Sequence, residues 1–284
     1  MSGSRLEPDV TTCEFEVPAL ERVRRLPLAE IRRMLDAAEA AARAPSWVAV
    51  LRADGRRGAA ELADRLGRRR KLAQRDSDRV ERLFDARRRL FARGLRHVAG
   101  VDEVGVGPLA GPVVAAAVVL PERVELPGLD DSKKLGATAR ERLSAAIHEQ
   151  ALGVAIAEVS PAEIDRMNVR RASLEAMRRA VESLVSQIEV EHVMVDAHRI
   201  PSIAIPQTPL IHGDALDGSI AAASIVAKVH RDALMQRLED EHPGYGFAHH
   251  MGYGTAEHLA ALQLLGASPI HRRSFAPVAA VVGA

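Results

Sequence analysis

A chain of 284 residues with 47% hydrophobic and 27% charged residues can fold into one large or two smaller globular domains, which excludes an intrinsically disordered protein. Its single cysteine, Cys13, excludes an internal disulfide and is typical of a reducing cytoplasm. The acidic, proline-interrupted first residues do not predict a signal peptide, and the most apolar stretch, 109–120, is too short and too rich in glycine and proline to span a membrane.

The net charge of +1 conceals an uneven distribution along the chain. Residues 1–98 carry 23 Lys or Arg and 15 Asp or Glu, whereas the remaining residues carry 16 and 23. The basic excess is greatest within 52–96, where 16 Lys or Arg residues stand against 7 Asp or Glu residues. This asymmetry indicates that the first part of the chain binds a polyanion and that the second part contains the functional acidic residues. A solvated helical face is the alternative interpretation of the basic part.

The first part of the chain is typical of an all-helical region. The expected elements are an irregular tail over 1–18, a helix over 27–43, a turn over 52–58, and helices over 59–74 and 77–94. In the last helix, Ser77 suits the N-cap and Gly94 the C-terminal end. Its apolar stripe consists of Val80, Leu83, Phe84, Leu90 and Phe91. We therefore expect a basic helical extension over 1–96.

The pattern changes at His97, where runs of valine and alanine alternate with helical segments. Strands are expected over 98–104, 111–120, 152–160 and 191–196, and helices over 137–150, 160–184 and 219–240. The helix that starts at Ser160 has an expected break near Asn168. This order of elements favours an α/β domain with a mixed sheet.

Four acids stand where these strands end or helices begin. Asp102 and Glu103 interrupt an apolar strand just before a glycine-rich turn, Asp196 ends another strand, and Asp214 precedes the long helix. Neighbouring side chains on a strand point to opposite faces, so we expect Asp102 and Glu103 to share a site only where their strand ends. Hard oxygen donors suit Mg²⁺ or Mn²⁺, and two such ions roughly 3.5–4 Å apart support phosphoryl chemistry. Taken singly, Asp196 is equally typical of a turn and Asp214 of a helix cap.

Several stretches in one order resemble the bacterial ribonuclease HII family. They are AGVDEVGVGPLAGPVVAAAVVL, DSKKL, SPAEIDRMNVRRASLEAMRRAV, VDAHR, GD followed by SIAAASIVAKVHRD, and GYGTAEHLAALQLLGASPIHRRSFAPV. The resemblance covers about His97 to Val278. It implies an RNase H-like fold with a five-stranded mixed sheet, flanking helices and a C-terminal helical region, so that a catalytic domain over 97–284 would follow the extension.

The resemblance also implies an activity and a metal site. Members cleave the RNA strand of RNA–DNA hybrids and incise 5′ to a ribonucleotide embedded in duplex DNA, leaving a 3′-hydroxyl and a 5′-phosphate. Two divalent cations, Mn²⁺ or Mg²⁺, would be held by Asp102, Glu103, Asp196 and Asp214. Asp102 would bridge both ions, with Glu103 and Asp196 favouring one and Asp214 the other. Neither a membrane nor an obligate protein partner is implied.

The resemblance also implies which residues bind the substrate. The turn after the acid pair would meet the 2′-hydroxyl through backbone groups, a tyrosine would pack on the sugar of the following deoxynucleotide, and basic side chains would contact phosphates. These positions are Gly105, Val106, Gly107, Tyr253, Lys133 and Lys134, with Arg272 or Arg273 as a further phosphate contact.

The chain departs from the family pattern at three places. Val106 stands where the family normally has arginine, Met251 replaces a usual lysine, and DAHR replaces the common DGNR. The two lost charges predict weaker binding and poorer incision at single ribonucleotides. The basic first part is expected to compensate for them.

Three competing interpretations remain open. The related ribonuclease HIII also lacks the arginine and would prefer longer runs of RNA. A nucleic-acid-binding protein without catalysis is disfavoured because all four acids are present. A zinc site would have to come from His242, His249, His250 and His258, whose spacing matches no standard ligand pattern.

Overall fold

The computed structural model describes residues 20–37 and 45–283, which divide into two compact units, 1–77 and 78–284. The predicted tail over 1–18 and the predicted helix beyond Ala37, up to residue 43, lie outside the described residues. Among the described helices, none combines the length and the apolar character needed to cross a membrane. The division at Ser77 falls earlier than the boundary expected at residue 96.

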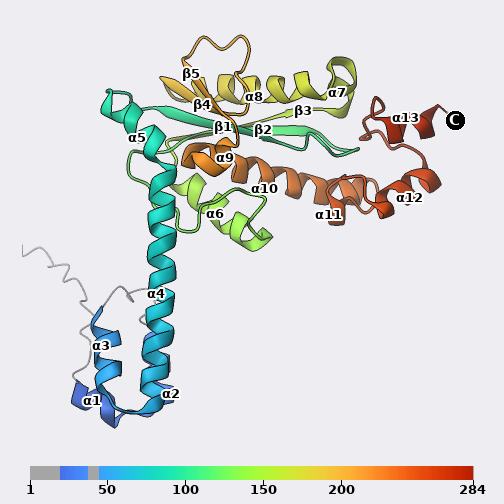
Figure 1. Cartoon of the computed structure of the whole chain (residues 1–284). Helices are drawn as coiled ribbons and strands as arrows, with labels where there is room; N and C mark the ends of the chain where they lie inside the picture. Colours follow the sequence, from blue (N-terminus) through green and yellow to red (C-terminus); the bar gives the residue numbers. More distant parts are fainter. Residues whose placement is uncertain (1–19, 38–44, 284) are drawn as a thin grey trace, which may run out of the picture. The chain divides into compact units, whose positions relative to one another are not determined.

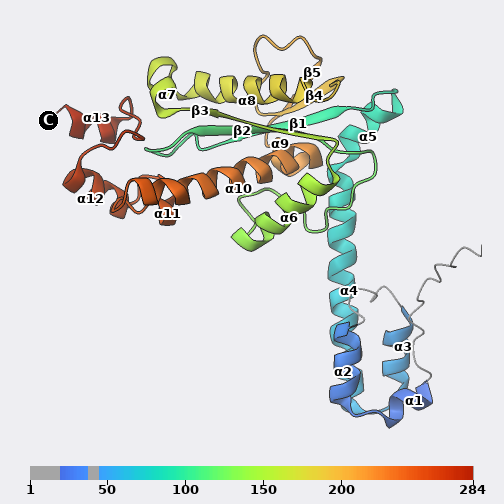
Figure 2. The same ribbon diagram turned by 180° about the vertical axis from the view of Figure 1, so that it is seen from behind.

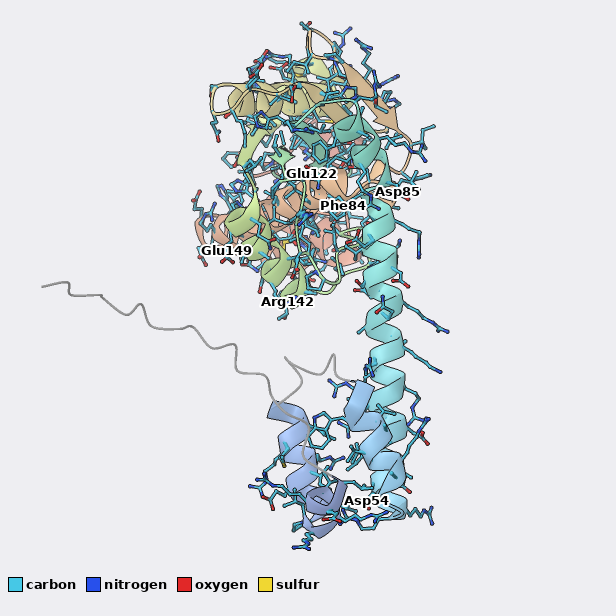
Figure 3. The ribbon with its side chains drawn as sticks, turned by 90° about the vertical axis from the view of Figure 1, so that its left-hand side faces the viewer. Asp54, Phe84, Asp85, Glu122, Arg142 and Glu149 are labelled. Atoms are coloured by element: carbon cyan, nitrogen blue, oxygen red, sulfur yellow. The ribbon has the colours of Figure 1, made fainter. Side chains whose placement is uncertain are left out.

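The first unit is built from short helices and the beginning of a long one. They are α1 (Leu20–Arg25), α2 (Leu28–Ala37), α3 (Pro45–Ala53) and α4 (Arg57–Leu83), seen in Figure 1 and, from behind, in Figure 2. Their shared core consists of Val23, Ile31, Leu35, Trp47, Leu51, Ala59, Ala63 and Leu66. Arg56, in the turn before α4, donates to both carboxylate oxygens of Asp54 at 2.6 and 2.8 Å (Asp54 is labelled in Figure 3). The same guanidinium donates to the carbonyls of Val23 and Leu26, so it ties the two turns of the unit together.

The long helix differs from the prediction of two helices over 59–74 and 77–94. Helix α4 continues without a break through Ser77, and the interruption comes at Phe84, before the short α5 (Asp85–Ala92). Arg, Lys, Leu, Gln and Glu make up most of the helix on both sides of the Asp76–Ser77–Asp78 run, and these three weak helix formers are too short an interruption to end it. Gly94 ends α5 as predicted: it has a φ of +96°, and its amide donates to the carbonyl of Phe91.

The last part of the predicted extension packs within the second unit. Two cores of that unit receive its apolar stripe, made of Val80, Leu83, Phe84, Leu90 and Phe91. Arg87 is buried with its guanidinium over the rings of Phe84 and Phe91, and it donates to the carbonyl of Leu120 at 3.2 Å. Residues 78–96 therefore form part of the globular body that holds the acids.

A five-stranded mixed sheet forms the centre of the second unit. Its strands are β1 (Val98–Val104), β2 (Val113–Val119), β3 (Gly153–Val159), β4 (His192–Asp196) and β5 (Gln207–Leu210). They lie in the order β3-β2-β1-β4-β5, antiparallel between β3, β2 and β1 and parallel between β1, β4 and β5. The edge strand β5 was not expected from its pattern because it is short and contains Pro209.

Helices cover both faces of this sheet, which confirms the predicted α/β class and RNase H-like arrangement. Figure 1 and Figure 2 show α8 (Val169–Val185) on one face and α10 (Gly218–Glu241) with α6 (Ala137–Gln150) on the other. The predicted break is confirmed: Asn168, with a φ of 72°, separates α7 (Pro161–Met167) from α8. After α10 the chain forms a C-terminal helical region with α11 (Phe247–His250), α12 (Ala256–Leu265) and α13 (Ala276–Val282).

Candidate metal centre and substrate surface

The acids meet where β4 ends beside β1. The parallel ladder between these strands stops at the pair Val101–Val195, whereas β1 stays paired with β2 through Val104. Asp102 and Asp196 are therefore the next residues of two adjacent strands, at a point where β1 has lost its neighbour on one side. Carboxylate oxygens of Asp102, Glu103 and Asp196 lie within 4.8 Å of one another. The acid pair thus lies in the last three residues of β1, beside the end of β4.

Serines from the helices on the two faces of the sheet flank the acid pair. Ser224 of α10 acts to lower the pKa of Asp102, and Ser173 of α8 acts to lower the pKa of Glu103, each against the larger, opposite effect of burial. The hydroxyls of Ser224 and Ser132 lie 2.8 Å apart, and both residues are buried. The segment that carries Lys133 is thereby joined to α10 beside Asp102.

Asp214 approaches the cluster from the short helix α9 (Gly213–Leu216). The amide of Gly213 donates to Asp196 Oδ1 at 2.7 Å, which anchors the start of this helix to the end of β4. Asp214 is buried, and its Oδ2 lies 2.9 Å from Lys133 Nζ. It is not one of the three acids within 4.8 Å of one another, but its charge contributes to the raised pKa of Asp102.

The electrostatics of this cluster are unfavourable for carboxylates alone. Burial, followed by the charge of Glu103, raises the pKa of Asp102 well above its usual range, and Asp196 and Asp214 add to the effect. Burial and the charge of Asp196 also raise the pKa of Glu103. A divalent cation would relieve this repulsion, and donor atoms that are all oxygen suit Mg²⁺ or Mn²⁺. The residues present therefore fit such ions.

The turn after β1 is held from behind by two buried arginines. Arg272 donates to the carbonyls of Gly105 at 2.5 Å and Val106 at 2.9 Å, and Arg231 donates to that of Pro112 at 3.0 Å. Gly105 has a φ of +85°, and a Cβ there would lie 2.2 Å from Arg231 Nε. Arg272 is fully buried, so its predicted phosphate contact is wrong. It is a clamp on the turn, because its donors are directed at backbone carbonyls.

Two of the predicted substrate residues lie side by side on this surface. A Cβ at Gly107 would be 3.6 Å from the Tyr253 ring, and the tyrosine side chain is 44% exposed. The two loops are joined by the amide of Leu109, which donates to the carbonyl of Gly252 at 2.8 Å. Of the predicted lysines, Lys133 reaches the acid cluster, whereas Lys134 pairs with Asp130 at 3.3 Å.

Two of the four histidines considered for a zinc site, His250 and His258, act as hydrogen-bonding core residues, whereas His249 is exposed. His250 Nδ1 accepts from the amide of Gly252, and its Nε2 lies 2.8 Å from the carbonyl of Tyr245. His258 uses its two ring nitrogens on the carbonyl of Tyr253 and on His271 Nε2. Within 20–37 and 45–283, a grouping of three or more potential metal ligands is found at the carboxylates alone.

Sequence reasoning missed the residues that support the site. Ser224 and Arg231 are buried polar side chains whose hydrogen-bond partners come from distant parts of the chain, and Ser173 is buried beside Glu103. The available signal was weak: Ser224 interrupts an apolar helical run, where a buried hydroxyl needs a partner.

Comparisons with known proteins agree with this geometry. A family model described as ribonuclease HII matches residues 99–278. A ribonuclease HII from Desulfitobacterium hafniense (strain Y51) is 51% identical over 203 residues, which cover 72% of this chain and 77% of the relative. One from Myxococcus xanthus (strain DK1622) is 50% identical over 82% of this chain and 79% of the relative. The solved ribonuclease H2 from Pyrococcus horikoshii OT3 aligns with a TM-score of 0.56 and 27% identity, over 65% of this chain and 96% of that one.

Proposed function

The chain belongs to the ribonuclease HII family, and we propose that it hydrolyses the RNA strand of RNA–DNA hybrids and incises 5′ to ribonucleotides embedded in duplex DNA. It is an endonuclease of the ribonuclease H type, and the proposal concerns its substrates and products, a 3′-hydroxyl and a 5′-phosphate. The observation that carries it is the gathering of oxygens from Asp102, Glu103 and Asp196 at the end of β4. A cytoplasmic location and the absence of an obligate protein partner stay predictions.

We further propose that Asp102, Glu103, Asp196 and Asp214 hold two divalent cations. Such ions supply an activated water and neutralise charge on the phosphate and the leaving oxygen. Lys133, which lies 2.9 Å from Asp214, would help to compensate the negative charge that a phosphodiester brings to the cluster.

The surface formed by Gly107 and Tyr253 would select the sugar. The exposed tyrosine ring offers a flat apolar face, and the side-chain-free Gly107 lets backbone come close to a ribose. Only the 2′-hydroxyl distinguishes RNA from DNA at one position, so its partners must lie within hydrogen-bonding distance of the scissile site. The clamp by Arg272 on the Gly105 and Val106 carbonyls would keep the turn in place during this selection.

A nicking assay tests the proposal. The full chain is mixed with a labelled RNA–DNA hybrid or with a duplex that contains one ribonucleotide, in MgCl₂, MnCl₂ or EDTA. Cleavage in either metal, and none in EDTA, is expected for both substrates. Cleavage of the hybrid alone would favour the ribonuclease HIII-like preference for longer RNA, and no cleavage of either would refute the proposed activity.

Replacing Val106 with arginine should improve incision at a single ribonucleotide. Val106 is half-buried on the clamped turn, so a longer side chain can extend from a backbone that Arg272 keeps in position. A charge-assisted hydrogen bond to phosphate contributes about 1.5–3 kcal/mol, or about 10–150-fold in kcat/KM. The measurement is single-ribonucleotide nicking by Val106→Arg and by the uncharged Val106→Gln, for which no gain is expected. Equal rates for the arginine variant and the unchanged chain would contradict the prediction.

A further inference from the structure

The middle of α4 contributes no residue to the hydrophobic cores found in the described part of the chain. Leu66 is the last residue of this helix in the core of the first unit, and no residue from Gly67 to Ser77 is buried. Figure 3 shows side chains projecting outward along this helix. Packing therefore does not explain the composition of this segment.

The same segment concentrates positive charge. From Arg65 to Arg75 the chain has six Lys or Arg and no Asp or Glu. Arg68, Lys71 and Arg75 are spaced by three and four residues, so they lie on one face of the helix, and all three are exposed. None of these three has a hydrogen-bonded or ionic side-chain partner in the part of the chain that the structure describes.

This arrangement is costly for the isolated helix. Like charges three and four residues apart repel and destabilise the helix, and an exposed stretch could have carried acids at the intervening positions to relieve it. A partner with regularly spaced negative charge would turn the repulsion into attraction. Leu72 is the single large apolar side chain that this segment exposes, so the face does not suit an apolar protein partner.

We propose that Arg68, Lys71 and Arg75 form a second contact for the nucleic-acid substrate, made with backbone phosphates and independent of base sequence. The three residues span about 10 Å along the helix, and a similar length of duplex carries about six phosphate charges, so each cation has phosphates available. The contact raises the affinity for hybrid or ribonucleotide-containing duplex without taking part in cleavage. This inference rests on the proposed function.

The test compares salt dependence. Arg68, Lys71 and Arg75 are replaced together with glutamine, which keeps a similar helix propensity, and retained helicity is checked by circular dichroism. Binding of the full chain to a fluorescein-labelled RNA–DNA hybrid is followed by anisotropy in EDTA between about 50 and 200 mM salt. The slope of log K against log salt should become shallower by about 2–3, because three phosphate contacts are lost. In steady-state nicking with MnCl₂, KM should rise severalfold while kcat changes by less than about twofold.

A matched control removes the same charge elsewhere. Arg89, Arg93 and Arg123 are exposed residues of the second unit, and their joint replacement by glutamine should leave the salt slope within error of the unchanged chain. An unchanged slope in the α4 variant, or an equal loss of slope in the control, would overturn the second contact. A chain that fails to nick the hybrid in any metal would instead refute the proposed function, so the two failures are distinguishable.

Discussion

Asp102→Asn should lower the rate of nicking by at least about 10³-fold and at the same time raise the melting temperature of the metal-free protein. The Asp102 carboxylate is buried, and one of its oxygens lies within 4.8 Å of a carboxylate oxygen of Glu103 and of one of Asp196. Removing one group that stabilises charge in the transition state lowers the rate by about 10²–10³-fold. Asp102 is also the acid whose pKa is raised most clearly, by burial and by the charges of three neighbouring carboxylates. Asparagine has nearly the same shape, so the packing around residue 102 can persist while one buried negative charge disappears.

The two effects have opposite signs because the same charge serves catalysis and opposes folding. Without metal, the cluster repels itself, and relief of about 1 kcal/mol shifts the melting temperature of a domain of this size by about 2–4 °C. With MnCl₂ present, the unchanged chain should gain stability from ion binding, whereas Asp102→Asn should gain less. Differential scanning fluorimetry in EDTA and in MnCl₂ measures both shifts.

The exposed Asp240→Asn on α10 is the control, because it removes one negative charge outside the cluster. It should leave the nicking rate and the metal-dependent stabilisation unchanged. If Asp102→Asn kept its full activity, or lost it while the response to MnCl₂ stayed intact, the assignment of Asp102 as a metal ligand would be wrong.

The sequence was informative about the acids because their local context conflicts with burial. Asp102 and Glu103 stand in a run of valine and alanine, where unpaired charge is expensive, so the residue pattern alone indicates a functional reason for them. Asp196 at the end of HVMVD follows the same logic. The spacing along the chain carried no information about convergence, which depends on where the β1–β4 ladder stops.

Arginine roles were the least predictable feature. Arg87, Arg231 and Arg272 are almost completely buried, and they donate to backbone carbonyls up to 167 residues away in the sequence. Nothing in a single sequence distinguishes such clamps from the exposed Arg68 or Arg75, because the partners are main-chain groups that every residue has. The continuity of α4 through Ser77 was missed for a related reason: helix propensity over a long basic stretch outweighed one local cap signal.

Gly100→Ala should destabilise the second unit and also lower the nicking rate. Gly100 lies in β1, two residues before Asp102, and a Cβ there would be 2.0 Å from the carbonyl carbon of Ser219 and 2.4 Å from the amide nitrogen of Ile220. Both atoms are backbone at the start of α10, so no side-chain rotation can make room. The helix must therefore move away from the sheet.

The expected cost is at the upper end of the range for overpacking, about 3 kcal/mol, which corresponds to a fall of about 6–12 °C in melting temperature. The start of α10 follows α9 directly, and α9 carries Asp214, so the displacement should also pull this acid away from Asp102. A drop of about tenfold or more in kcat is expected at a temperature where the variant is still folded.

Gly67→Ala provides the comparison, because a Cβ at Gly67 would have no neighbour within 4 Å of it among the described residues. That substitution lies within α4 and should stabilise the helix by about 0.5–1 kcal/mol with no change in kcat. A Gly100→Ala chain that melts and cleaves like the unchanged chain would show that the sheet and α10 do not need this close approach. If the variant instead lost stability but kept its full kcat, the position of Asp214 would not depend on the packing of α10. The hydrogen bond from Gly213 to Asp196 would then be enough to keep α9 in place.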